Sequence, residues 1–210
     1  MPRSIPIGFL IYPRVTQLDA TGPAQVLSRV PGAEIHMVWK NTDPVETDSG
    51  FSILPTIGFD ECPPLDVLCV PGGTGQRVLM QDETVLAFLR RQGRQARYVT
   101  SVCTGALLLG AAGLLRGSQS ACHWAFREEL RAFGAEPVAE RIVRDGNRIT
   151  GGGVTAGIDF GLLLAAELAG EDAARSIQLF LEYDPQPPFD SGSPEKAGEK
   201  LTAAVRAGFS

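Results

Sequence analysis

Residues 98–115 constrain the fold of this chain more than any other stretch. The β-branched run up to Val102 predicts a short buried strand, Thr104-Gly105 predicts a turn, and the Ala- and Leu-rich run that follows predicts a helix. Cys103 would then lie on a sharp bend, facing the unpaired N–H groups and the partial positive charge of the helix start. We therefore expect Cys103 to be a nucleophile that ionises more easily than a free cysteine. The alternative is a small buried hydrophobic residue.

Apolar runs of strand length alternate with helical segments along the rest of the chain. Continuous apolar runs are typical of strands that are buried on both faces of a parallel sheet. This pattern predicts an α/β fold in which at least five mostly parallel strands carry helices on both faces, with Cys103 at the carboxyl edge of the sheet. The strands are expected at residues 5–12, 34–39, 65–70 and 98–102, with a hairpin at 142–150. The helices are expected from residue 17 and at 82–92, 156–168 and 173–183.

The remaining segments are less regular. Residues 41–64 predict irregular structure with a short hairpin around 45–54, and residues 125–133 predict an amphipathic helix. A proline-rich segment at 185–194 is expected to run extended, and the tail at 195–207 favours a helix. We expect residues 1–210 to form one domain, with the C-terminal proline-rich segment and helix, residues 184–210, packed on it.

Composition and charge exclude several functions. The 210 residues are 44% hydrophobic and carry a formal net charge of −5, which gives no basic surface for nucleic acid or for an anionic membrane. No apolar run approaches the roughly 20 residues of a membrane span, and the N-terminus does not resemble a signal peptide, so we expect a cytoplasmic protein. With only two histidines, His36 and His123, the sequence implies no metal and no other cofactor. The four cysteines lack the paired spacing of a zinc ribbon or a redox dithiol: Cys62, Cys69, Cys103 and Cys122.

Two further turns are candidate parts of a site. Asp19 follows the first predicted strand, where α/β proteins place ligands, although a helix cap is an equally good interpretation from spacing alone. Glycines in the segment 71–75, Pro-Gly-Gly-Thr-Gly, follow the third predicted strand and would let the backbone approach a ligand. The segment lacks the spacing of a dinucleotide-binding motif, and an isolated Pro-Gly-Gly is more often a simple turn. His36 alternates within a strand as a structural residue, and His123 is expected to cap a helix or to line a wall.

Taken together and in this order, the motifs resemble those of the ThiJ/PfpI superfamily, whose fold is similar to that of class I glutamine amidotransferases. They are the Asp19 turn, the Val-Pro-Gly-Gly loop, the Ser-Val-Cys-Thr-Gly elbow, His-Trp at 123–124 and Thr-Gly-Gly-Gly-Val-Thr-Ala-Gly from residue 150. The resemblance covers nearly the whole chain and implies a flavodoxin-like three-layer sandwich with a nucleophile elbow. It places the nucleophile at Cys103, its acidic partner at Asp19 and a supporting hydroxyl at Thr104.

Within the superfamily, the chain is most similar to the members that hydrate isocyanides. That resemblance implies a small isocyanide as substrate and a two-fold homodimer. Attack by a thiolate on the isocyanide carbon, followed by addition of water, would give an N-substituted formamide. We expect the backbone N–H groups of Gly73 and Thr104 to stabilise negative charge near the sulfur. The residues expected to bind substrate or an oxyanion are Gly72, Gly73, Trp124, Gly152 and Val154.

Other activities of the superfamily are alternatives. Peptidase-like members have a histidine directly after the nucleophile, where this chain has Thr104, which argues against a protease. Many transcription regulators have a similar elbow followed by a helix-turn-helix domain, which the sequence up to Ser210 does not contain. A regulatory role would therefore be that of a stand-alone ligand or redox sensor. A cysteine-dependent hydrolase or a glyoxalase-like enzyme is the remaining alternative.

Overall fold

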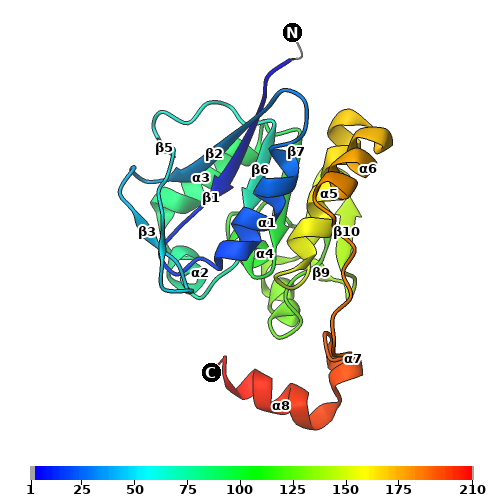
Figure 1. Ribbon diagram of the computed structural model, residues 1–210. Helices are drawn as coiled ribbons and strands as arrows, with labels where there is room; N and C mark the ends of the chain where they lie inside the picture. Colours follow the sequence, from blue (N-terminus) through cyan, green and yellow to red (C-terminus); the bar gives the residue numbers. More distant parts are fainter. Residues whose placement is uncertain (1–2, 210) are drawn as a thin grey trace.

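A computed structural model describes residues 3–209 and is built around one seven-stranded sheet (Figure 1). The strand order is β10-β11-β7-β6-β1-β2-β5, and every neighbouring pair is parallel except β10 and β11. The strands are β1 (Ile5–Leu10), β2 (Ala33–Trp39), β5 (Ile57–Gly58), β6 (Val67–Val70), β7 (Tyr98–Val102), β10 (Ile142–Asp145) and β11 (Arg148–Gly151). The prediction of a mostly parallel sheet with at least five strands is confirmed.

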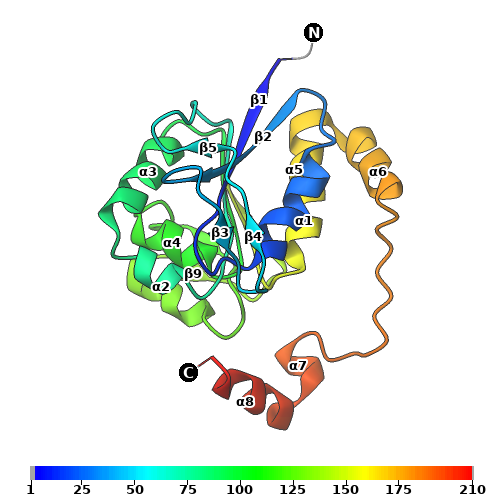
Figure 2. The ribbon, with the colours of Figure 1, turned by 60° about the vertical axis from the view of Figure 1, so that its left-hand side comes forward.

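Helices cover both faces of the sheet, which explains why the central strands have no polar face (Figure 2). All residues of β6 and β7 are buried. One face is covered by α1 (Gln17–Leu27), α5 (Ala156–Ala169) and α6 (Glu171–Phe180). The other face is covered by α2 (Gln76–Leu79), α3 (Glu83–Gly93) and α4 (Gly105–Ala111). The predicted three-layer sandwich is thereby confirmed.

The helices α1 and α5 approach each other closely because glycines lie between them. A Cβ atom at Gly157 would lie 3.0 Å from Pro23 Cδ, and one at Gly161 would lie 3.0 Å from Val26 Cβ. This close packing holds α1 against α5. Asp19 belongs to the first turn of α1, so it lies within the helix and not in the turn before it, where the sequence pattern had suggested.

Several short elements refine the expected secondary structure. The hairpin around residues 45–54 is confirmed as β3 (Val45–Glu46) and β4 (Ser52–Ile53), whereas α2 and β5 were not expected. A second short pair joins β8 (Gln119–Ser120) and β9 (Glu136–Pro137). The α-helix predicted at 125–133 is wrong, because Arg127–Phe133 forms a 3₁₀ helix, η1. Only Leu130 of η1 is buried, so little packing is available to support a regular amphipathic helix.

The chain after α6 leaves the three-layer body. Residues 184–192 are exposed and form neither helix nor strand, as expected for the proline-rich segment, and they lead to α7 (Pro194–Ala197) and α8 (Glu199–Ala207). Figures 1 and 2 show these two helices beyond the end of the extended segment, and Arg206 at the end of α8 contacts Trp124 and Ala125 of the body. Within residues 3–209, no helix combines the length and the apolar character needed to cross a membrane.

Candidate active site

Four neighbouring strands bring the candidate site residues to one edge of the sheet. The strands β1, β6, β7 and β11 are adjacent, and their carboxyl ends point the same way. Asp19 comes from the helix that follows β1, Gly72 follows β6, Cys103 follows β7 and Gly152 follows β11. Residues up to 133 positions apart in the sequence therefore meet at the carboxyl edge, as predicted for Cys103.

Cys103 occupies a strained elbow between β7 and α4. Its φ of 58° lies in the left-handed region, which costs a non-glycine residue about 1–3 kcal/mol unless the surroundings hold it there. Its N–H donates to the carbonyl oxygens of Gly152 at 2.7 Å and Gly151 at 3.1 Å. A Cβ atom at Gly105 would lie 2.0 Å from the carbonyl oxygen of Val70, so the helix can begin this close to β6 only with glycine at this position. The predicted strand–turn–helix elbow is confirmed.

Asp19 is a buried carboxyl group whose two oxygens have different surroundings. Asp19 is only 1% exposed. Its Oδ2 accepts a hydrogen bond from the Gly72 N–H at 2.8 Å. The buried Oδ1 has no hydrogen-bond partner within residues 3–209. The interpretation of Asp19 as a helix cap is wrong, because Thr16 is the N-cap residue of α1 and Asp19 binds the loop after β6.

The peptide group between Pro71 and Gly72 connects Asp19 to a second buried side chain. The hydroxyl of Tyr12 donates to the Pro71 carbonyl at 2.9 Å, while the N–H of the same peptide group donates to Asp19. Hydrogen bonds in such a chain polarise and strengthen one another. A Cβ atom at Gly72 would lie 2.7 Å from the N atom of Thr104 and 2.9 Å from Asp19 Oδ2, so this loop can meet the elbow only with glycine there.

Gly73 and Thr104 bind each other, whereas the N–H groups of both were expected to face the sulfur of Cys103. The N–H of Gly73 donates to Thr104 Oγ1 at 3.1 Å, so the expectation that it would stabilise charge near the sulfur is wrong. The loop lies so close to residues 14–16 that a Cβ atom at Gly73 would be 2.4 Å from the Arg14 carbonyl oxygen. The N–H of Thr104 does interact with the Cys103 sulfur, where it favours the thiolate.

Burial dominates the protonation of Asp19. Removal from water raises the pKa of its carboxyl group from 3.8 to about 7, although the hydrogen bond from the Gly72 N–H and the neighbouring Cys103 thiol act in the opposite direction. A carboxyl group with a pKa near neutrality can both donate and accept a proton under physiological conditions.

The expectation that Cys103 ionises easily is wrong for this buried site. Burial raises the pKa of its thiol well above the usual range, the neighbouring Asp19 and Cys122 raise it further, and only the Thr104 N–H lowers it. A helix N-terminus stabilises a nearby charge by about 0.3–1 kcal/mol, which is less than one pKa unit, whereas full burial can shift a pKa by about 3–5 units. Because Asp19 and Cys103 each affect the other's pKa, their titrations belong to the pair.

The other three cysteines are also free thiols, and burial raises the pKa of each. The pKa rises to about 11 for the half-buried Cys62 and to about 12 for Cys69 and Cys122. None of the three has a hydrogen-bonded acid beside it as Cys103 does. Cys103 is therefore distinguished among the cysteines by its carboxyl partner and its backbone strain.

Of the expected binding residues beyond the elbow, one contacts Cys103 and two lie in neighbouring loops. Gly152 contacts Cys103 directly through its carbonyl oxygen. Val154 is half-buried in the loop between β11 and α5, where its carbonyl accepts the N–H of Gly157. Trp124 is half-buried and packs edge-on against Phe209, with ring centroids 6.3 Å apart. The structure thus places Gly152 in the site, and the roles of Val154 and Trp124 in binding remain predictions.

His123 is half-buried and hydrogen-bonded within its own loop, and its expected place in a wall of the site remains a prediction. Its Nδ1 accepts a hydrogen bond from the Ala125 N–H at 3.3 Å, and burial lowers the pKa of the imidazole. Its ring lies 5.3 Å from the ring of Phe209 in an edge-on arrangement.

Tyr12 is a site residue that the sequence reasoning missed. The sequence pattern predicts it as the last residue of an apolar strand, but its buried hydroxyl holds the peptide group that binds Asp19. A buried tyrosine usually places its hydroxyl on a hydrogen-bond partner, so a tyrosine at the carboxyl end of an apolar strand is a signal that could have identified it.

Comparison with known proteins identifies the family of this chain. Residues 6–167 match the DJ-1/PfpI family, so the chain belongs to that family. It is 57% identical over 203 residues to a Pseudomonas putida protein named isonitrile hydratase, covering 97% of this chain and 89% of that protein. A crystal structure of a ThiJ/PfpI family protein from Pseudomonas syringae superposes with a TM-score of 0.95 at 46% identity, covering 97% of this chain and 85% of that one.

More distant relatives have other names. The HTH-type transcriptional regulator GbdR of Pseudomonas aeruginosa is 31% identical over 187 residues, which cover 85% of this chain but only 50% of the regulator. The structure of Drosophila melanogaster DJ-1beta is similar with a TM-score of 0.79, and at 22% identity it supports the fold alone.

Proposed function

We propose that this protein is an isocyanide hydratase, a hydro-lyase that adds water to an isocyanide to give an N-substituted formamide. The identity of 57% to isonitrile hydratase over nearly the whole chain carries this proposal, since isonitrile is another word for isocyanide. The buried pair of Cys103 and Asp19 supplies the nucleophile and the acid that this reaction needs.

The first half of the reaction forms a covalent thioimidate. The Cys103 thiol passes its proton to the Asp19 carboxylate as its sulfur attacks the terminal carbon of the isocyanide and forms a carbon–sulfur bond. The same carbon still has an electron pair, and it takes the proton from the Asp19 carboxyl group. The unpartnered Oδ1 of Asp19 is the atom suited to this transfer, because Oδ2 is already bound to Gly72.

The second half of the reaction consumes water and regenerates the pair. The Asp19 carboxylate takes a proton from water as the hydroxide adds to the thioimidate carbon, and it passes that proton to the nitrogen. Asp19 then takes the hydroxyl proton as the carbon–oxygen double bond forms and the carbon–sulfur bond breaks. The formamide leaves, and the site again holds one proton between Cys103 and Asp19.

The neighbouring residues would hold this pair in place. We assign to Thr104 a supporting role through its N–H near the sulfur, and to Gly72 the positioning of the Asp19 carboxyl group. Gly73 would orient the Thr104 hydroxyl, and Gly152 would fix the elbow through its carbonyl oxygen. Trp124 and Val154 are proposed as uncharged walls for the apolar group of the isocyanide.

The functional unit is proposed to be a homodimer of this chain. Large apolar side chains are exposed along the C-terminal part, including Leu179 and Phe180 on α6 and Phe189 in the extended segment. Exposed apolar surface of this kind is typical of a protein–protein interface. Light scattering at micromolar concentration should give twice the mass of the chain.

A turnover assay with the purified protein tests the proposed activity. The protein is mixed with an aryl or an alkyl isocyanide, and the formamide is followed by chromatography against a no-enzyme control. Formamide formation that saturates with isocyanide supports the proposal. A protein that binds isocyanide without producing formamide contradicts it.

The similarity to GbdR favours one alternative, a ligand sensor that uses the same domain without turnover. A sensor would bind a small molecule at the elbow with saturable affinity and leave it unchanged. The same assay separates the two, because recovery of the unaltered isocyanide after binding indicates a sensor.

A further inference from the structure

Four aromatic rings gather around the loop at residues 123–126, and the function proposed above gives a role only to Trp124. We call these rings the aromatic cluster: His123, Trp124, Phe126 and Phe209. The first three belong to the loop, and Phe209 reaches them from the end of α8. The Phe209 ring lies edge-on to all three, with centroids 5.3, 6.3 and 5.2 Å away. Aromatic rings favour this arrangement at such distances.

The aromatic cluster begins beside the nucleophile. The Gly152 carbonyl accepts the Cys103 N–H at 2.7 Å, and a Cβ atom at the next residue, Gly153, would lie 3.7 Å from Cδ2 of the His123 ring. On the other side of His123, Cys122 is close enough to Cys103 to raise the pKa of its thiol. Both neighbours of the His123 ring therefore connect it to the elbow.

This position suits the substituent of an isocyanide. The isocyanide group is linear, so the substituent on nitrogen extends directly away from the carbon that the sulfur attacks. Cys103 and Asp19 are 6% and 1% exposed, and they would surround the reacting carbon. The substituent then meets residues one layer further from the sulfur, and the aromatic cluster is in that layer.

The aromatic cluster offers rings without charge. Burial lowers the pKa of the His123 imidazole, so this ring is neutral at pH 7. The guanidinium groups of Arg206 and Arg77 lie 4.8 and 5.8 Å from the ring centres of Trp124 and Phe126, where the faces of these rings attract them. Such a site fits an uncharged apolar group better than a charged one.

We infer that the aromatic cluster binds the nitrogen substituent of the isocyanide and favours an aromatic one, with Phe209 as a residue that determines this specificity. The inference rests on the proposed hydratase function. A phenyl substituent would extend the edge-on packing that Phe209 already makes with His123 and Phe126. A saturated ring would bury a similar apolar area but has no π-system, so it gains only from the burial.

Steady-state kinetics with phenyl isocyanide and cyclohexyl isocyanide test the inference. The two substrates differ in intrinsic reactivity, so each variant is compared with wild type on the same substrate. Phe209→Leu keeps an apolar side chain and removes the ring, and Phe209→Tyr restores a ring. Phe189→Leu is the matched control, because it makes the same exchange at a residue that is 79% exposed and lies outside the aromatic cluster.

We expect Phe209→Leu to raise KM for phenyl isocyanide about threefold to tenfold and to leave KM for cyclohexyl isocyanide within about twofold. The kcat for both substrates should stay within about twofold, because a contact to the substituent is made equally before and during the reaction. Phe209→Tyr and Phe189→Leu should keep the wild-type KM values within about twofold.

Two kinetic outcomes would overturn the inference. An equal loss of kcat/KM with both substrates in Phe209→Leu would mean that Phe209 only holds the loop in place. Unchanged KM values with both substrates would mean that Phe209 has no part in binding.

Calorimetric binding of the two products separates this inference from the hydratase proposal. N-Phenylformamide and N-cyclohexylformamide are titrated into wild type and Phe209→Leu, which needs no turnover. An aromatic preference that is lost in Phe209→Leu, in a protein without turnover, would refute the hydratase and sustain the aromatic site. Normal turnover with the same affinities in both proteins would refute the aromatic site alone. Neither binding nor turnover would overturn both.

Discussion

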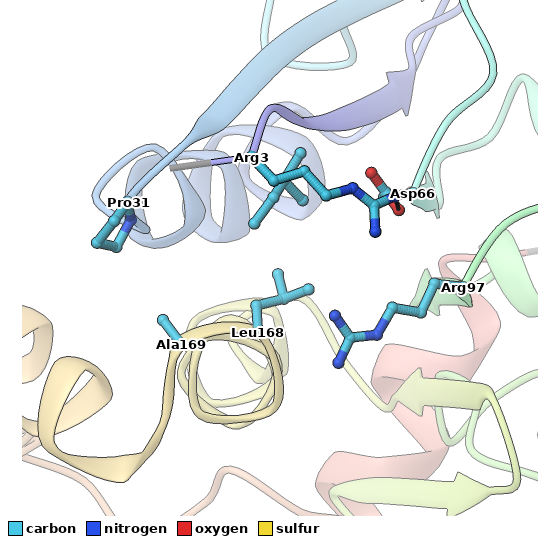
Figure 3. A pocket seen from close by; sticks show the side chains of 7 residues that line it. Arg3, Pro31, Asp66, Arg97, Leu168 and Ala169 are labelled. Atoms are coloured by element: carbon cyan, nitrogen blue, oxygen red, sulfur yellow. Dashed lines mark hydrogen bonds and ion pairs between the residues drawn. The ribbon is translucent and has the colours of Figure 1, made fainter. Parts of the chain in front are cut away.

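The two edges of the central sheet contrast in how their polar groups are arranged. At the carboxyl edge, Cys103 and Asp19 are buried, one with a strained backbone and the other with an unpartnered oxygen. At the amino edge, a hollow of about 400 Å³ is open to solvent (Figure 3). Its lining consists of Arg3, Ile5, Pro31, Asp66, Arg97, Leu168 and Ala169. There Arg3 pairs with Asp66 at 2.9 Å, and Arg97 donates to the Glu167 carbonyl at 3.1 Å.

This difference shows which physical features indicate chemistry. A buried carboxyl group with a raised pKa and a residue at positive φ both cost stability, so they persist where the function needs them. The amino-edge hollow carries no such cost, since its charged groups are solvated and paired with each other or with the backbone. The presence of a hollow is therefore not by itself a sign of an active site.

The largest effect should come from Cys103→Ser. Serine keeps the size of the side chain, but its hydroxyl ionises far less readily than a thiol and cannot form the thioimidate at a comparable rate. We expect formamide production to fall at least about a thousandfold with little change in the unfolding temperature. Cys62→Ser is the control and should retain most of the activity. Substantial turnover by Cys103→Ser would exclude covalent catalysis through this sulfur.

Asp19→Asn should have the next largest effect. The amide can still accept the hydrogen bond from Gly72, but it cannot exchange a proton with the substrate carbon or with water. The rate should therefore fall by about two to four powers of ten. Asp48→Asn is the matched control, because Asp48 raises the pKa of Asp19 from an exposed position and takes no part in proton transfer. Thiolate absorbance against pH should differ between wild type and Asp19→Asn, and superimposable titrations would rule out a coupled pair.

The same substitution should change the pH dependence of stability. The pKa of Asp19 is about 7 in the folded protein and 3.8 in the reference state, so the folded state binds this proton more tightly. The contribution of Asp19 to the free energy of unfolding therefore falls as pH rises from about 4 to 7, by at most about 1.4 kcal/mol per pH unit. Urea unfolding should show that Asp19→Asn gains stability relative to wild type across this range. A constant difference between the two proteins would show that burial does not raise the Asp19 pKa.

Tyr12→Phe should have a smaller effect on the carboxyl edge. Loss of the hydroxyl removes one hydrogen bond of about 0.5–1.5 kcal/mol from the Pro71 carbonyl, which corresponds to a rate decrease of about 2- to 12-fold. The Gly72 N–H becomes a weaker donor to Asp19, so the pKa of the carboxyl group should rise and the pH–rate profile should move to higher pH. Lower stability with an unchanged profile would indicate a purely structural role.

The amino edge should tolerate substitution. Arg97→Ala removes a side chain from the hollow, and because Arg97 is exposed, activity should stay within about twofold and stability within about 1 kcal/mol of wild type. A large loss of formamide production in this variant would mean that the two edges are coupled, and it would break the contrast described above.

Much of this architecture follows from local pattern. Apolar runs of strand length, alternating with helical segments, correctly predicted the parallel sheet with helices on both faces. The elbow at Cys103 and the glycine turn at residues 71–75 were also predicted, because β-branched residues, glycine and proline have strong local preferences. The amphipathic pattern at 125–133 wrongly predicted an α-helix, since Leu130 is the single buried residue of the 3₁₀ helix that forms there.

Tertiary structure alone decided how these pieces act together. The hydrogen bond between Gly72 and Asp19 joins residues 53 positions apart, and the one between Tyr12 and Pro71 joins residues 59 apart. Strand order and register set such distances, and periodicity does not encode them. The raised pKa of Cys103 likewise depends on burial by neighbouring elements, which outweighs the local effect of the helix start. The sequence by itself thus determined which residues lie at strand ends, and the adjacency of β1, β6 and β7 decided which of them lie close enough to shift each other's pKa.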